Sequence, residues 1–248
     1  ENIKTDTLLV RTIASFVKNS VLSVAVGKTK QGIDNAMAAL NTTVYPRLRV
    51  ELPVSTVGME YTCHIKAPKM LELVRELVSY AKEKCDDVEF CAIDATRAES
   101  SFLKDVLTTA VESGASVVTV CDSAAEIMPD KFGEFVSQHI INGVSVGVMC
   151  DNKNGLAAAN AVIAAKNGVN TVKTAVGGNE IPLEIFAGII KNCGNSCGFE
   201  SALKSTELNR IIKQINWVSN NTKNEKALNI AEIEEESINL TVNDDSDT

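Results

Sequence analysis

The chain has 248 residues, of which 45% are hydrophobic and 23% charged, a composition typical of one compact soluble domain with a sizeable core. Its formal net charge of -8 argues against a nucleic-acid partner, because binding to the phosphate backbone requires clustered lysine and arginine. The sequence has no charged-then-apolar leader and no apolar run of about 18 residues, so we expect a cytoplasmic protein with no membrane partner.

Short β-branched runs alternate with helical stretches along most of the chain, as in βα units that build a parallel sheet. The predicted strands cover residues 21–26, 47–53, 88–92, 116–121, 144–150 and 171–176. Residues 67–85 predict a helix with one buried face, because apolar side chains recur at i, i+3, i+4 and i+7. Two further helices, residues 100–114 and 154–168, each end on a glycine, which favours a left-handed C-terminal cap. Residues 220–248 are acidic and lack aromatic side chains, so we expect this tail to leave the core.

Six strands of this kind fit either an open doubly wound sheet or most of an eight-stranded barrel. No strand is followed by a Gly-x-Gly-x-x-Gly turn, which argues against the dinucleotide-binding form of the open sheet. Three strands are instead followed by an acid, namely Asp94, Asp122 and Asp151. The carboxyl ends of parallel barrel strands face one rim, where active sites lie, so we expect these three carboxylates on one rim.

Sulfur-containing side chains also gather at the ends of the predicted strands. The chain has seven cysteines, and this odd number favours reduced thiols over a disulfide framework. Cys91, Cys121 and Cys150 end neighbouring strands, which leaves open either a soft-metal cluster with Met149 or simple packing of a barrel interior. Packing is the interpretation that we favour.

Three consecutive segments carry a resemblance to a known family. They read VEFCAIDATRAESSFLKDVL (88–107), VVTVCDSAAEIMP (117–129) and VGVMCDNKNGLAAANAVIAAKNG (146–168). In order and spacing they resemble the isopropylmalate synthase and homocitrate synthase family, metal-dependent TIM-barrel enzymes that condense acetyl-CoA with a 2-oxo acid. The resemblance extends to residues 12–40 and 49–61.

The resemblance implies a particular fold and a particular gap in it. Residues 1–219 would form an incomplete α/β barrel of the TIM type, with strands three to eight of eight, followed by the acidic tail at 220–248. The family's first two strands, which supply a metal ligand and a catalytic arginine, have no counterpart here. A barrel without them has unpaired strand edges, so we expect a homo-oligomer or a partner chain that supplies the missing strands.

The family's metal site is altered in this sequence. There the strand equivalent to 144–150 leads into His-x-His-Asn-Asp, and its two imidazoles bind a divalent cation. Here Met149 and Asp151 stand at the imidazole positions, Asn152 is retained and Lys153 replaces the aspartate. A thioether is a poor ligand for a hard cation. The resemblance leaves Asp151 and Asn179 as candidate ligands for Mg, Mn or Zn if the protein is active, and otherwise we expect no cofactor.

Other metal-site positions depart from the family as well. Gly58 stands where the family has a histidine, and Ile93 where it has an acid. The only two histidines of the chain are His64 and His139. We interpret His64 as a solvated loop residue and His139 as an ordinary residue of a predicted helix.

Part of the substrate site is retained. Asp94 and Arg97 match the family, and the pair Asp122–Ser123 matches an Asp-Thr pair whose hydroxyl helps to hold the oxo acid's carboxylate. The resemblance therefore implies a carboxylate site made by these four residues with Asn152. It assigns no catalytic residue.

Three functions follow from these observations. The substitutions favour a degenerate or divergent homologue of acyl-CoA:2-oxo acid condensing enzymes that binds a small carboxylate weakly without catalysis. The first alternative is an active metal-dependent acyltransferase completed by N-terminal strands from outside the chain. The second is an enzyme in which Lys153 acts as a base or a Schiff-base nucleophile, although simple pairing of Lys153 with Asp151 or Asp122 is the simpler interpretation.

Overall fold

The structure, a computed structural model, describes residues 3–221 and consists of two compact units. The first unit contains the residues up to Thr174 together with Asn179–Ile181, and the second contains Ala175–Gly178 and the residues from Pro182 onward. Residues 220 and 221, which we predicted to begin the acidic tail, are helical and belong to the second unit. The rest of the predicted tail lies outside the described residues.

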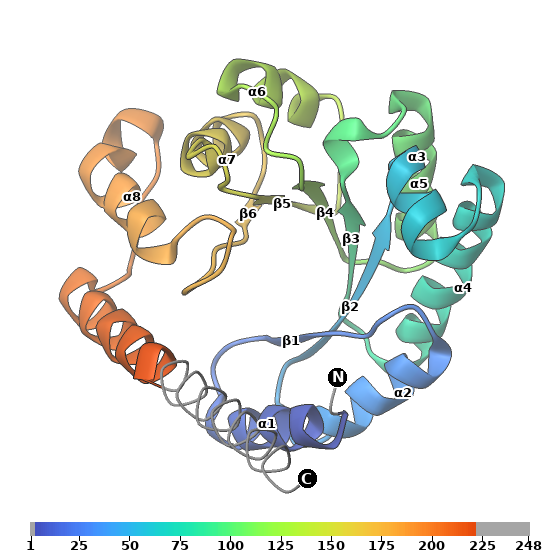
Figure 1. Ribbon diagram of the computed structural model, residues 1–248, viewed down its shortest axis with the longest axis horizontal. Helices are drawn as coiled ribbons and strands as arrows, with labels where there is room; N and C mark the ends of the chain where they lie inside the picture. Colours follow the sequence, from blue (N-terminus) through green and yellow to red (C-terminus); the bar gives the residue numbers. More distant parts are fainter. Residues whose placement is uncertain (1–2, 222–248) are drawn as a thin grey trace, which may run out of the picture. The chain divides into compact units, whose positions relative to one another are not determined.

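Six parallel strands form one curled sheet in the first unit, and neighbouring strands follow one another in chain order (Figure 1). They are β1 Leu22–Ala25, β2 Pro46–Pro53, β3 Val88–Ile93, β4 Val117–Asp122, β5 Ser145–Cys150 and β6 Thr171–Val172. The predicted incomplete α/β barrel is therefore confirmed. The largest difference from the prediction is in β6, which covers two of the six predicted residues. The Lys173 amide still donates to the Val148 carbonyl, but Ala175 then bridges to Pro182.

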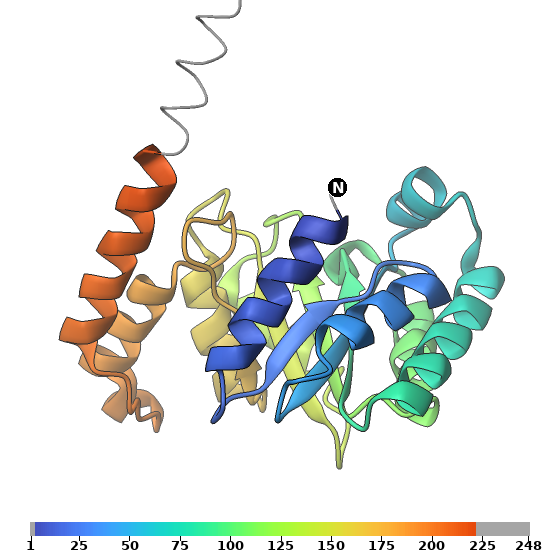
Figure 2. The ribbon, with the colours of Figure 1, turned by 90° about the horizontal axis from the view of Figure 1, so that it is seen from below.

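Helices join the strands, and α2, α4, α5, α6 and α7 cover the convex side of the sheet (Figure 1). The helical segments of this unit are α1 Ile3–Phe16, α2 Lys30–Ala39, α3 Thr56–Gly58, the π-helical turn η1 Met59–Cys63, α4 Ala67–Lys84, the 3-10 turn η2 Ala95–Arg97, α5 Ser100–Glu112, α6 Pro129–Ser137 and α7 Ala157–Lys166. Side chains cap several of them; the Thr29 hydroxyl, for example, accepts a hydrogen bond from the Gly32 amide at the start of α2. Figure 2 shows α1 beside α2, where Arg11 donates a hydrogen bond to the Ala38 carbonyl.

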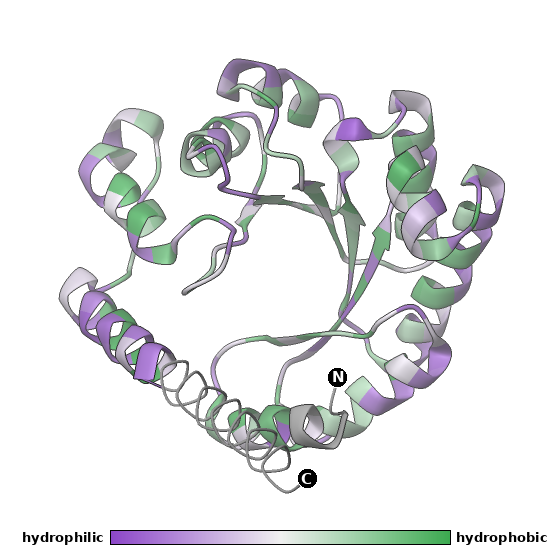
Figure 3. Ribbon diagram, in the orientation of Figure 1, coloured by the Kyte–Doolittle hydropathy of each residue, from purple (hydrophilic) through white to green (hydrophobic). Residues whose placement is uncertain are grey.

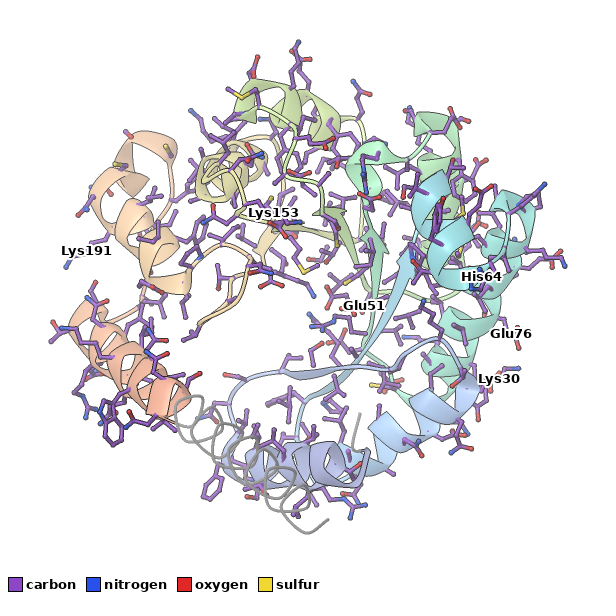
Figure 4. All side chains as sticks on the ribbon, viewed as in Figure 1. Lys30, Glu51, His64, Glu76, Lys153 and Lys191 are labelled. Carbon is purple, nitrogen blue, oxygen red and sulfur yellow. The ribbon has the colours of Figure 1, made fainter. Side chains whose placement is uncertain are left out.

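The two faces of the sheet differ in chemistry because side chains alternate along each strand. On the convex side, Leu48, Val50 and Leu52 of β2 are fully buried under the helices, and hydrophobic residues alternate with hydrophilic ones along those helices (Figure 3). On the concave side the same strand carries Arg49 and Glu51, and Glu51 points into the curve of the sheet (Figure 4). Complete barrels usually fill this space with branched aliphatic side chains, so a charged concave face is unusual.

The second unit consists of helices and short connections. Its first helix, α8 Leu183–Cys197, ends at Gly198 in the left-handed conformation that glycine favours, and a second helix spans residues 205–221. Within residues 3–221 of the chain, no helix is both long enough and apolar enough to cross a membrane.

Candidate functional site

The three strand-end acids lie together at one rim of the sheet, as the sequence predicted. Asp94 follows β3, Asp122 ends β4 and Asp151 follows β5, and these three strands are parallel neighbours. The Asp151 amide donates to the Asp122 carbonyl at 2.9 Å, and the Thr96 hydroxyl, next but one to Asp94, donates to Oδ1 of Asp122 at 3.0 Å. The rim is therefore a connected polar network.

Asp94 is the anchor of this network. Its carboxylate accepts hydrogen bonds from Nε and Nη2 of Arg97 at 2.8 and 2.7 Å, and a third from the hydroxyl of the buried Ser55. Its backbone has φ = 61°, a left-handed conformation that few residues other than glycine adopt without strain. The amide of Asp94 donates to the Ser123 hydroxyl at 3.1 Å, which brings the candidate carboxylate-binding residues Arg97 and Ser123 to the same aspartate.

Asp122 is the most deeply buried acid of the rim. It is 1% exposed, and its Oδ2 has no hydrogen-bond partner, whereas Oδ1 accepts hydrogen bonds from Thr96 and from the Ala125 amide. Burial raises the pKa of Asp122 above its ordinary value of 3.8, and the negative charge of Asp151 adds to this effect. The hydrogen bonds from Thr96 and Ala125 and the nearby Asn160 amide oppose the shift without cancelling it. The fold thus makes Asp122 easier to protonate than an ordinary aspartic acid.

We expect Asp122→Asn to stabilise the protein by about 1 kcal/mol near neutral pH, because an amide removes the cost of a buried, incompletely paired charge. The raised folded-state pKa means that Asp122 weakens the fold as pH rises through the interval between the ordinary and the raised value. Urea denaturation should therefore give a gain for the variant near neutral pH that shrinks in acid. A constant loss at every pH would contradict this account.

The candidate metal ligands are already used by neighbouring groups. Oδ1 of Asp151 accepts a hydrogen bond from the Lys153 amide at 2.9 Å, and Oδ2 lies 3.4 Å from the Lys153 ammonium. The Asn152 amide donates to the carbonyl of Asn179, while the side-chain oxygen of Asn152 accepts from the Ala157 amide at the start of α7. The Asn152 side chain is therefore bound to the backbone at the start of α7, and Lys153, 63% exposed, forms the simple ion pair that we favoured over catalysis.

The donors present do not fit a divalent cation. Met149 offers a soft thioether, and Asp151 shares its carboxylate with an ammonium group. Gly58 has no room for a larger side chain, since a Cβ there would lie 2.8 Å from Cβ of Pro53 and 2.9 Å from Oγ of Ser55. Within residues 3–221, no group of three or more His, Cys, Asp or Glu side chains is placed to hold a metal ion.

The two histidines lie apart from this rim network. His64 is exposed, caps η1 in a left-handed conformation, and lies well away from Lys153 (Figure 4). We predicted that His139 lies inside a helix, and this was wrong. It lies in the turn that follows α6, where its Nδ1 is 2.7 Å from the Phe135 carbonyl oxygen. Burial lowers the pKa of His139, so it is a buried structural residue.

The strand-end cysteines divide between the two faces of the sheet. Cys91 and Cys121 share the concave-side register, and a hydrogen bond to Cys91 together with burial raises the pKa of the Cys121 thiol. Cys150 lies on the other face, fully buried, and burial raises the pKa of its thiol as well. A single soft-metal cluster of all three thiols with Met149 is therefore wrong, because alternation along β5 separates Cys150 from the rest.

Sequence reasoning missed an ion pair on the concave face, between Lys173 and Glu89. The Lys173 ammonium lies 2.6 Å from Oε1 of Glu89, and the same oxygen accepts a 2.6 Å hydrogen bond from the Thr119 hydroxyl. Cys91 lies 3.4 Å from Glu89 and 3.6 Å from the Lys173 nitrogen. One signal was available, since both charged residues occupy positions within predicted strands where apolar residues are usual.

Comparison with known proteins agrees with this architecture. The HMGL-like family profile matches residues 3–224. The chain is 32% identical over 174 residues to 2-isopropylmalate synthase 1 of Caldanaerobacter subterraneus subsp. tengcongensis, and 30% identical over 211 residues to 2-isopropylmalate synthase of Oceanobacillus iheyensis. These matches cover 68% and 81% of the chain, but 44% and 41% of the relatives. The crystal structure of the HMG-CoA lyase from Brucella melitensis superimposes with a TM-score of 0.67 at 14% identity, covering 83% of this chain and 78% of the lyase chain.

The fold and the rim define an α/β-barrel protein of the TIM type whose polar side chains gather at the carboxyl ends of its strands. The chain belongs to the HMGL-like family, and the resemblance to isopropylmalate synthases predicted from the sequence is confirmed. It spans less than half the length of these two curated relatives.

Proposed function

We propose that this chain is a divergent homologue of the acyl-CoA:2-oxo acid condensing enzymes that binds a small carboxylate weakly and does not catalyse metal-dependent condensation. The observation that carries the proposal is the donor set at residues 149–153. A thioether and a carboxylate already paired with Lys153 stand where the family has two imidazoles. A divalent cation polarises the reacting oxygen in such chemistry, and these donors are ill suited to hold one.

The carboxylate site that we propose lies at the ends of β3 and β4. Arg97 uses Nε and Nη2 to hold Asp94, and its side chain is 47% exposed, so its other guanidinium hydrogens remain available to a ligand. The oxygen of Ser123 accepts a hydrogen bond from the Asp94 amide, which leaves the hydroxyl hydrogen free to donate. A guanidinium and a hydroxyl so arranged are suited to one carboxylate. Asp122 and Asn152 would bound this site on the side of β5.

We expect a 2-oxo acid or a small dicarboxylate to bind the protein with millimolar affinity, because the attraction of a cation is missing. In Arg97→Ala the affinity should fall by about tenfold or more, the loss expected for one charge-assisted hydrogen bond to the carboxylate. Ligand-observed NMR with a panel of oxo acids measures both values. Release of free CoA from acetyl-CoA, assayed with metal present, should be undetectable.

The matched control is Arg75→Ala, which removes an exposed arginine from α4 and should leave binding unchanged. Because Arg97 also holds Asp94, circular dichroism must first establish that Arg97→Ala is folded. Equal affinity for the wild type, Arg97→Ala and Arg75→Ala would refute the proposed site. Failure of every oxo acid and dicarboxylate to bind would leave only a scaffold or interaction role.

The alternative is an active metal-dependent acyltransferase completed by strands from a second copy or another polypeptide. One observation favours it: among the described residues β1 pairs with β2 alone, so its other edge has backbone groups available for a further strand. Steady CoA release that requires both metal and a 2-oxo acid, and that is lost in Arg97→Ala, would support this alternative over the proposal above.

A further inference from the structure

The concave face of the sheet contains a buried amine next to a proton acceptor. The Lys173 side chain is 17% exposed, and its ammonium group lies 2.6 Å from the carboxylate of Glu89, which is 2% exposed. Glu89 is the second residue of β3, so the pair lies below the rim network, which begins beyond the end of that strand. The proposed carboxylate site uses neither residue.

The sequence builds this arrangement across four neighbouring strands. Lys173 follows β6 and reaches past β5 and β4 to Glu89 on β3. On the same inward face β5 has Gly147, whose lack of a side chain leaves room for the Thr119 hydroxyl, since a Cβ there would lie 2.7 Å from it. The same hydroxyl fixes Glu89 through a 2.6 Å hydrogen bond.

The electrostatics of the pair fix its resting charge state. Burial raises the pKa of Glu89, but the charge of Lys173 and the hydrogen bonds from three neighbours together leave that pKa below its ordinary value of 4.5. The resting pair is therefore ammonium and carboxylate. At 2.6 Å the carboxylate can accept the ammonium proton and thus generate the amine that a nucleophile requires.

A carboxylate-bearing carbonyl compound also finds a positive charge beside the amine. Arg49 of β2 lies opposite Glu89 in the strand register, on the same concave face. Its Nε lies 2.6 Å from Oε1 of Glu51, and the guanidinium has further donors for a ligand's carboxylate. The arginine thus adds a positive charge on the strand next to the Glu89 partner of the lysine.

We propose that Lys173 forms an imine with a small 2-oxo acid inside the curve of the sheet, with Glu89 moving the protons. Glu89 takes a proton from the ammonium group, and the amine nitrogen attacks the oxo carbon to form a C–N bond. The carbinolamine then loses its hydroxyl group as water with the proton that Glu89 returns, and a protonated C=N bond remains. The nitrogen is positively charged before and after the reaction, so Glu89 has an ionic partner in both the starting and the final state.

The test is reductive trapping on the full chain with pyruvate, followed by peptide mass mapping. Cyanoborohydride adds hydride to the imine carbon, so the labelled lysine gains the mass of the acid less one oxygen atom. We expect a label concentrated on Lys173 that saturates with pyruvate concentration. Glu89→Gln should label about 100-fold more slowly, the lower end of the effect typical of general acid–base assistance.

The variants Lys173→Arg and Lys153→Arg separate the buried lysine from an exposed one. Lys173→Arg keeps the positive charge but cannot form the imine, so the label should disappear, whereas Lys153→Arg should behave as the wild type. Site mapping on the wild-type protein needs no variant to fold. A label spread evenly over exposed lysines, or no label at all, would overturn the proposal. Neither result would contradict the proposed rim site, because that site is tested separately by the affinity of Arg97→Ala for oxo acids.

Discussion

Replacing Lys173 with methionine is expected to lower the free energy of unfolding by about 3–5 kcal/mol near neutral pH, the cost typical of breaking a buried ion pair. Glu89 would keep its charge in a site that is 2% exposed, with hydrogen bonds from Thr119 and Cys91 but no cation. Urea denaturation followed by circular dichroism measures the loss. This is the largest effect of a single substitution that we predict.

The pH dependence of this loss follows from the sign of the Glu89 shift. In the wild type the pKa of Glu89 is lowered, so the pair contributes stability above the ordinary carboxyl value and loses it as pH falls through the lowered one. In Lys173→Met only the hydrogen bonds from Thr119 and Cys91 still oppose burial, which is the largest influence. The pKa of Glu89 should therefore rise above its ordinary value, and the charge should become destabilising as pH increases. The difference between the two proteins should therefore be greatest near neutral pH and small in acid.

The double variant Glu89→Gln with Lys173→Met is the matched control, because it removes both charges. It should recover most of the stability that Lys173→Met loses, since replacing both partners of a buried pair is often nearly neutral. A double variant as unstable as the single one would mean that the lysine stem contributes packing and that the charge pair is incidental.

Restoring two imidazoles should create a metal site where the present donors are poor. In Met149→His with Asp151→His, both side chains stand on alternate residues at the end of β5, and Asp151 no longer pairs with Lys153. We expect affinity for zinc or cobalt to rise by at least about 100-fold over the wild type, since loss of even a supporting group in a metal site costs 10–100-fold. Calorimetric titration with zinc and the absorption spectrum of bound cobalt measure the change.

The single variant Met149→His is the control for this experiment. It adds one imidazole and leaves the ion pair between Asp151 and Lys153 intact, so it should gain little affinity. Low-micromolar binding by the wild type itself, abolished in Asp151→Ala, would instead mean that the present donors suffice and would revive the acyltransferase alternative. No gain in the double variant would show that the end of β5 does not present residues 149 and 151 to one cation.

Most of the fold could be predicted because each strand and helix has a local signal. The predicted ends of the first five strands lie within one residue of the observed ones, since β-branched runs end at polar punctuation. The exception is β6, where residues 173–176 have strand composition but lose the neighbouring ladder. Whether such residues pair depends on a distant segment, and composition carries no information about that.

The residues of the candidate site also divide into those that the sequence predicts and those that depend on distant contacts. Asp94, Asp122 and Asp151 were predictable because a residue at the end of a parallel strand is placed by topology alone. The contact between Glu89 and Lys173 was not, because it depends on a long side chain crossing two intervening strands. Likewise, the Arg97 guanidinium matched the family, but only the structure places two of its nitrogens on Asp94.

The order of the sheet has a consequence for the way the protein is made. Each strand pairs with the one synthesised just before it, so no strand has to be inserted later between two others. Successive βα units can therefore dock one at a time as they leave the ribosome, each closing a loop of modest length. The contact between Lys173 and Glu89 is the late exception, since it joins the last strand to a middle one and forms only when the sheet is complete.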